Sequence, residues 1–188
     1  MAVGTRPDCI DEAILELLVS FTDDYDVWLE LGLQSAHNET LGRIQRGHRV
    51  ESFLQAVKLA SATPLSICAH VILGLPGEDH QKMMATAQLL ASLPIHGVKI
   101  HHCQVIRGTP LAEQYLADEY EPLAYAQYLQ YVCDFLEYLP WPVTIQRLLG
   151  EAPKNLILAP LWGIKKDTVL KHIDQELDRR QSIQGTKS

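Results

Sequence analysis

The sequence contains no apolar run long enough to span a membrane, only four cysteines and no excess of positive charge. Its N-terminal segment lacks the basic-then-apolar order of a signal peptide, so we expect a cytoplasmic protein with no membrane partner. The formal net charge is −7 at pH 7, which gives no general attraction to nucleic acid or to anionic lipid. Composition alone therefore favours neither a membrane-bound protein nor a broadly basic nucleic-acid-binding protein.

The cysteines are also scattered. Cys9, Cys68, Cys103 and Cys133 match neither the closely spaced pairs of a zinc site nor the dense pattern of a small disulfide-linked domain. We expect reduced, mostly buried thiols, and no metal site in this chain.

What the sequence does contain is enough apolar material for one core. The chain has 188 residues, of which 47% are hydrophobic, so we expect one globular unit rather than two domains with separate cores.

Hydrophobic periodicity predicts an array in which strands alternate with helices. The predicted strands are residues 2–4, 27–33, 65–73, 97–106 and 143–147. The predicted helices are residues 8–21, 39–46, 50–60, 81–92, 123–139 and 165–180. This alternation favours parallel strands, in either an open doubly wound sheet or part of a (β/α) barrel. A complete eight-unit barrel needs about 250 residues, so we predict an α/β fold built as an incomplete TIM-type barrel.

The most informative segment is residues 69–78, AHVILGLPGE, an apolar run that stops at a turn rich in glycine and proline. Gly74 and Gly77 allow positive φ or close approach of the backbone to a ligand, and Pro76 stiffens the turn. Taken alone, the string is equally consistent with a simple connection between strand and helix.

Other short motifs accompany it in a fixed order. They are GTRPDC at residues 4–9, ELGLQS at 30–35, IQRGH at 44–48, HVILGLPGE at 70–78 and RGTPL at 107–111. In order and spacing this set resembles radical S-adenosylmethionine (SAM) proteins of the elongator-like branch, and within it proteins of the YhcC/YtqA type. The resemblance runs through the whole chain, including LILAPLW at residues 156–162 and the closing helix.

The resemblance implies a [4Fe–4S] cluster held by a C-x-x-x-C-x-x-C loop, which reduces SAM and cleaves it to methionine and a 5′-deoxyadenosyl radical. This chain has no such loop, and thiolates are the ligands that the cluster requires. We therefore interpret the chain as the C-terminal portion of a radical SAM protein, with no cofactor expected on the chain by itself. Residues 1–140 correspond to the back part of the barrel, and residues 141–188 to a C-terminal extension.

The resemblance also implies a SAM site at the carboxyl ends of the strands, where barrel proteins place their ligands. A glutamine at the position of Gln34 contacts SAM in related enzymes, and an arginine matching Arg46 lies near the same ligand. A guanidinium suits the methionyl carboxylate, and a carboxylate suits the ribose hydroxyls. Glu30, inside an apolar strand, is a ligand candidate because an unpaired buried carboxylate is costly. Its simpler role is pairing with a buried Arg or Lys.

Further positions follow from the same resemblance. His70 stands where a relative has an aspartate that contacts SAM, and Ile72 and Gly74 match the strand that lines the adenine. His102 and Gln104 are candidates for the polar lining of the site. Two assignments have structural alternatives: Gln34 with the following serine as a helix cap, and Arg46 with the following glycine as a helix end.

Two functional classes remain open. The preferred one is a fragment of a radical SAM Fe–S enzyme with an unknown substrate, with tRNA modification and an RNA partner implied by analogy only. The alternative is a non-catalytic α/β interaction or scaffold protein. In either case we expect a homo-oligomer, because a first strand so short leaves a sheet edge for another copy to cover.

Overall fold

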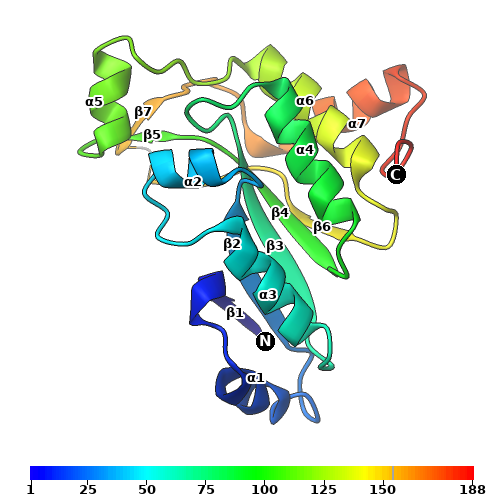
Figure 1. The fold of residues 1–188 in the computed structure, drawn as a ribbon. Coiled ribbons are helices and arrows are strands. Elements are labelled where there is room, and N and C mark those ends of the chain that lie inside the picture. The colour runs from blue at the N-terminus through cyan, green and yellow to red at the C-terminus, as the bar shows by residue number, and fades with distance from the viewer. Residues whose placement is uncertain (154) are drawn as a thin grey trace.

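The fold is built on one sheet of parallel strands, as Figure 1 shows. The structure is a computed structural model that describes residues 1–153 and 155–188. The sheet has the order β1-β2-β3-β4-β6, formed by β1 (Ala2–Thr5), β2 (Trp28–Gln34), β3 (Ser66–Leu73), β4 (Gly97–His102) and β6 (Thr144–Arg147). Every neighbouring pair in it is parallel. The predicted α/β class is confirmed, and the arrangement is consistent with a partial (β/α) barrel.

Helices connect these strands. They are α1 (Glu12–Val19), α2 (Asn38–Arg43), α3 (Val50–Ala60), α4 (His80–Ala91), α5 (Pro110–Leu116), α6 (Tyr125–Tyr138) and α7 (Lys166–Arg179), with the short 3-10 helix η1 (Pro7–Cys9) before α1. In Figure 1, α2 and α5 lie beyond one end of the sheet, while α3, α4 and α6 lie along it. No helix in the described part of the chain is both long and apolar enough to cross a bilayer.

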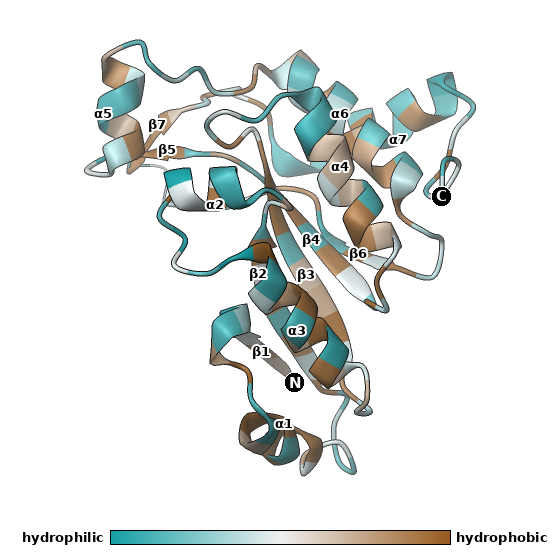
Figure 2. Cartoon of the chain, in the orientation of Figure 1, coloured by the Kyte–Doolittle hydropathy of each residue, from teal (hydrophilic) through white to brown (hydrophobic). Residues whose placement is uncertain are grey.

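The main core lies between the sheet and these helices. Leu29, Leu31 and Leu33 alternate along β2 and are fully buried. They pack in one cluster with side chains of α3, α4 and α6. Because successive residues of a strand point to opposite faces, the residues between them form the other face of the sheet. Figure 2 shows hydrophilic and hydrophobic bands along the same strands.

The prediction of one continuous strand over residues 97–106 is wrong, because β4 ends at His102. The last parallel pair joins Leu73 to His102, because β3 ends there and the chain turns at Gly74 with φ +82°. The following residues form β5 (Val105–Ile106), which pairs antiparallel with β7 (Ile157–Ala159) in a separate two-stranded sheet.

Two helix predictions also need correction. The helix expected from residue 8 begins at Glu12, because the Asp11 carboxylate accepts a hydrogen bond from the Ile14 N–H at 2.8 Å and caps that turn. Helix α5 was not predicted, although Thr109 caps it and Pro110 is its first residue. The division at residue 140 stays a prediction. Strand β6 lies beyond it and completes the sheet.

Candidate functional site

A charged network crosses the face of the sheet opposite the main core. Glu30 on β2 contacts two side chains: the Lys99 ammonium, 2.5 Å from Oε1, and His70 Nε2, 2.9 Å from Oε2. The side chains of Glu30 and Lys99 are only 10% and 15% exposed. The simpler role considered for Glu30, pairing with a buried basic residue, is therefore present in the structure, and its ligand role stays a prediction.

The electrostatics of this network fix the hydrogen-bond roles. Burial alone would raise the pKa of the Glu30 carboxyl, but the hydrogen bond and charge of Lys99, aided by His70, bring that pKa below its usual value. Burial lowers the pKa of His70 despite the neighbouring Glu30 carboxylate. A neutral His70 must donate its Nε2–H, because an ionised carboxylate can only accept.

His101 extends this face toward the end of β4. Its ring stacks on that of His70 with centroids 5.9 Å apart. Burial, followed by electrostatic interactions with His70, Arg147 and Lys99, lowers the pKa of His101 to about 4. Its buried Nε2 has no hydrogen-bond partner in the described part of the chain. His101 therefore keeps a neutral imidazole nitrogen buried and unpaired among the described residues.

The end of β2 holds a second group of polar side chains around Gly32. Arg46 Nη2 and His48 Nε2 lie 3.3 and 3.0 Å from the Gly32 carbonyl oxygen. A Cβ at position 32 would collide with the ends of the Arg46 and Gln34 side chains, so glycine allows both to lie close to the strand in this arrangement. Gln34 itself has a φ of +70° at the end of the strand. The structure thus brings together two of the residues predicted to form the SAM site.

Arg46 is the least satisfied member of this group. Its Nε is buried without a hydrogen-bond partner, and among the described residues Arg46 forms no salt bridge. Burial, followed by the like charge of Arg6, lowers the pKa of the Arg46 guanidinium. A half-buried guanidinium with a buried, unpaired Nε and no salt bridge favours an anionic ligand.

The turn after β3 is packed rather than open. The Tyr120 hydroxyl donates to the Gly74 carbonyl at 2.7 Å, and a Cβ at position 74 would meet the side chain of Leu123. The register places Ile72 beside His101 on the charged face. Gly74 therefore serves the turn and the close approach of Leu123 in this structure, and its predicted contact with adenine stays a prediction.

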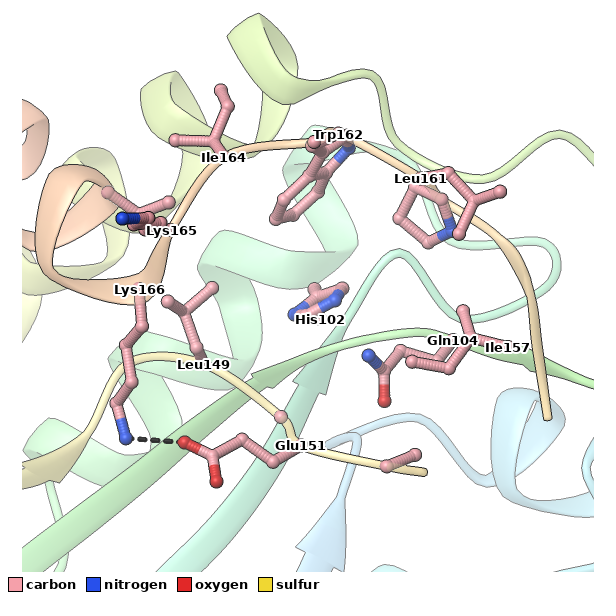
Figure 3. A pocket seen from close by; sticks show the side chains of 15 residues that line it. His102, Gln104, Leu149, Glu151, Ile157, Leu161, Trp162, Ile164, Lys165 and Lys166 are labelled. Carbon is pink, nitrogen blue, oxygen red and sulfur yellow. Dashed lines mark hydrogen bonds and ion pairs between the residues drawn. The ribbon is translucent and has the colours of Figure 1, made fainter. Parts of the chain in front are cut away.

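A cavity of about 650 Å³ lies at the carboxyl ends of β4 and β6, and Figure 3 shows it from close by. His102 and Gln104 line it, together with Leu149, Gly150, Glu151, Ala152, Ile157, Pro160, Leu161, Trp162, Gly163, Ile164, Lys165, Lys166 and Val169. The other predicted site residues lie outside this lining. The structure therefore separates Gln104 from the group at Gly32.

His102 is the buried polar group of the cavity wall. Its ring lies 4.5 Å from that of Trp162 and 5.6 Å from that of Tyr128, measured between centroids. The side chain is 8% exposed, and its Nδ1 is buried without a partner in the described residues. Burial, followed by the nearby His101, lowers the pKa of His102 to about 4.

Sequence reasoning missed Lys99 and Trp162. Lys99 interrupts an apolar strand as Glu30 does, so the same signal could have identified it. Trp162 lies in the late motif, but nothing in the sequence indicates that its indole meets His102, because the two residues are far apart in the chain.

The described residues do not fit a [4Fe–4S] cluster. Among them no group of three or more His, Cys, Asp or Glu side chains is placed to hold a metal ion. Three of the four cysteines are buried separately, and Cys9 is exposed.

A parallel α/β sheet with polar side chains at the carboxyl ends of its strands is consistent with the fold of radical SAM proteins, and two family models match the chain. Residues 1–90 match the Radical SAM superfamily model, and residues 95–179 match the Radical_SAM C-terminal domain model. The chain belongs to the radical SAM superfamily.

Individual relatives sharpen this assignment. An uncharacterised protein of Methanocaldococcus jannaschii is 39% identical over 100% of this chain and 59% of its own length. YtqA of Bacillus subtilis is 36% identical over 98% of this chain and 58% of its own length. A tRNA uridine(34) acetyltransferase of Methanocaldococcus infernus is 27% identical over 96% of this chain and 33% of its own length. The chain thus spans less than two thirds of each of these relatives.

A solved structure supports the fold. The archaeal Elp3 of Methanocaldococcus infernus with an N-terminal deletion superposes with a TM-score of 0.85 at 24% identity. The match covers 97% of this chain and 42% of the Elp3 chain. At this identity the likeness concerns the fold.

Proposed function

We propose that this chain forms the wall of a SAM-binding active site in a radical SAM enzyme that acts on an unknown substrate. The resemblance assigns Gln34 to contact with SAM and Arg46 to the neighbourhood of the same ligand, where its guanidinium suits the methionyl carboxylate. It assigns Glu30, His70, Ile72, Gly74 and Gln104 to the remaining wall. Radical SAM enzymes obtain the 5′-deoxyadenosyl radical from SAM by reductive cleavage at a [4Fe–4S] cluster. The proposal assigns that cluster to another part of a longer protein.

One observation carries the proposal. Arg46 keeps a buried guanidinium nitrogen unpartnered beside Gly32 and Gln34, and no carboxylate of the described residues pairs with it. The methionyl carboxylate of SAM is an anion of the right chemistry for such a group.

The substrate is proposed by analogy alone. Several relatives are named tRNA uridine(34) acetyltransferases, which makes tRNA modification the leading candidate for a longer protein. The net charge of −7 offers no electrostatic support for RNA binding by this chain. The four free cysteines agree with the proposed cytoplasmic location.

A second candidate, a non-catalytic α/β interaction or scaffold protein, is favoured by the lack of a cluster-binding group among the described residues. The two candidates differ in one respect that can be measured. The wall of a SAM-dependent active site binds SAM, even weakly, whereas a scaffold protein does not.

Ligand-observed NMR on the 188-residue chain tests this difference. We expect saturation transfer to SAM and to 5′-methylthioadenosine, which lacks the methionyl carboxylate. Arg46→Gln should weaken SAM binding by about tenfold and leave methylthioadenosine unchanged, because only SAM presents the carboxylate. Arg49→Gln is the matched control, since Arg49 is exposed and pairs with Glu51 at 3.3 Å. The proposal fails if SAM gives no signal or if Arg46→Gln changes nothing.

Anaerobic reconstitution with iron and sulfide tests the assignment of the cluster. The purified chain should stay colourless, hold no stoichiometric iron and form no 5′-deoxyadenosine from SAM, because its cysteines cannot surround a cluster. Stoichiometric iron with the absorbance of a [4Fe–4S] cluster would contradict the assignment.

We also propose that a second copy of the chain covers the β1 edge. Strand β1 has one neighbour in the sheet, and Leu17 of α1 and Phe21 in the turn after it are 59% and 40% exposed. Light scattering should show a dimer that Leu17→Glu converts to a monomer. Leu161→Glu is the control, because Leu161 is 74% exposed elsewhere on the chain. A wild-type monomer at all accessible concentrations would exclude this association.

A further inference from the structure

The cavity at the ends of β4 and β6 has the features of a ligand site that shares Gln104 with the proposed SAM wall but extends beyond that wall. Its volume of about 650 Å³ lies within the usual range for small-molecule pockets. Leu149, Ile157 and Trp162 give it apolar walls, and Figure 3 shows their side chains around one opening. Such walls suit the flat or aliphatic body of a small molecule.

Two neutral polar groups in the lining lack partners. His102 is more than nine-tenths buried, its Nδ1 is sealed from solvent, and its ring forms no hydrogen bond to the described residues. The Gln104 side chain beside it in the lining also has no hydrogen-bond partner among the described residues. Buried polar groups are normally satisfied, so the unsatisfied His102 in a cavity wall, with the half-buried Gln104 beside it, indicates a missing hydrogen-bonding ligand.

The first turn of α7 supplies positive potential at the same cavity. No side chain caps this helix at Lys165, and the backbone N–H groups of Lys166 and Asp167 have no acceptor in the described part of the chain. Glu151 is the carboxylate of the lining, and it pairs with the Lys166 ammonium at 2.5 Å. Lys165 remains as a lining cation without an ion pair among the described residues. This end of the cavity therefore favours an anion.

We propose that the cavity binds a small organic anion with a flat apolar body and a second hydrogen-bonding group. The anionic group lies at the first turn of α7 and Lys165. The body lies against Trp162 and Leu149, and the second polar group reaches His102 and Gln104. This site goes beyond the proposed SAM wall, because Arg46 and Gln34 are absent from its lining.

Three related probes test the proposal on the 188-residue chain: 6-hydroxy-2-naphthoate, its methyl ester and 2-naphthoate. In ¹⁵N–¹H spectra the hydroxynaphthoate should shift the Trp162 indole N–H, which donates to the Leu123 carbonyl at 3.1 Å, and the Gln104 amide. The Trp141 signal should stay in place, because that side chain is 75% exposed away from the cavity. The ester and 2-naphthoate should each bind roughly three to ten times more weakly, since each lacks one of the two polar contacts.

Two variants and two controls assign the contacts. Lys165→Gln should weaken the binding of the acid roughly threefold without changing the binding of the ester. Lys171→Gln, at an exposed site on the same helix, should change the binding of neither probe. His102→Phe should remove the advantage of hydroxynaphthoate over 2-naphthoate. Arg46→Gln should leave all three probes unchanged, which separates this site from the proposed SAM wall.

The comparison of the three probes uses the wild-type chain, so it does not depend on whether any variant folds. Equal binding of acid and ester, shifts that spare Trp162 and Gln104, or the same effect of Lys165→Gln and Lys171→Gln would each overturn the proposal. Saturable binding with the expected order of affinities would support it, whatever the outcome of the SAM experiment.

Discussion

The two faces of the sheet are made from alternate residues of the same strands, yet they carry opposite kinds of side chain. On the covered face Leu31, Val71 and Ile100 are fully buried against helices. On the other face the neighbouring positions hold Glu30 and Lys99 as an ion pair. One face is stabilised by removing apolar area from water, while the other depends on charges that satisfy one another. The comparison teaches that stability and site chemistry are assigned to separate sides of this sheet.

The covered face should be the more sensitive to truncation. Leu31→Ala should lower the free energy of unfolding by about 2–5 kcal/mol, because Leu31 is fully buried and the sheet cannot close over the cavity that forms. Urea denaturation followed by circular dichroism measures this change. Leu161→Ala, at a side chain 74% exposed, should stay within about 0.5 kcal/mol. Equal effects at the two positions would contradict the assigned core.

On the charged face, the effect should depend on which partner remains. Glu30→Leu should cost about 2–3 kcal/mol of unfolding free energy, because it leaves the Lys99 ammonium largely buried without a counter-charge. The double variant Glu30→Leu with Lys99→Met should regain most of that loss, since no unpaired charge remains.

An exposed ion pair provides the control for that cycle. Glu39 pairs with Arg43 at 3.2 Å, with side chains 67% and 48% exposed, so Glu39→Leu should change stability by less than about 0.5 kcal/mol. Urea titrations of all three variants give the comparison. A double variant as unstable as Glu30→Leu alone would show that the charge network does not determine the stability of this face.

The smallest expected effect is on the pH dependence of the free energy of unfolding. The pKa of His101 is lowered to about 4 in the folded protein, against an ordinary value of 6.5. As pH falls from 6.5 toward 4, the unfolded chain takes up a proton at this residue and the folded chain does not, so unfolding becomes easier. His101→Phe should reduce the pH dependence of stability by at most about 1.4 kcal/mol per pH unit in this window.

Ile100→Val, on the covered face, serves as the control for this measurement. It should lower stability by about 0.5–1.5 kcal/mol at every pH, because no ionisable group is involved. Unfolding curves between pH 4.5 and 7 distinguish a change of slope from a constant offset. An unchanged slope in His101→Phe would mean that the imidazole is free to ionise in the folded protein.

Much of the sheet could be predicted, because its signals are local. Apolar alternation locates β2 and β3, and the strand–helix order implies parallel pairing. Strand β5 could not be predicted as a separate element, because its apolar pattern continues that of β4. The chain beyond His102 has no parallel partner because β3 ends at Leu73.

For the candidate site, the individual residues were easier to predict than their partners. Glu30 stands out as a charge in an apolar strand, and Arg46 and Gln34 follow from the motifs. Their contacts depend on register: His70 lies beside Glu30 because β2 and β3 pair with Gly32 opposite His70. A one-residue change of register would turn those side chains to the other face.

Periodicity and motif order are properties of the chain alone, so they were enough to predict a parallel α/β protein that resembles the radical SAM superfamily. The tertiary structure decided that Glu30 is shared between Lys99 and His70, and that Arg46 remains without a counter-ion. It also decided that His102 meets Trp162 in a cavity. The physical reason is that such contacts join residues far apart in the chain, so their distances exist only after the strands have aligned and the helices have packed.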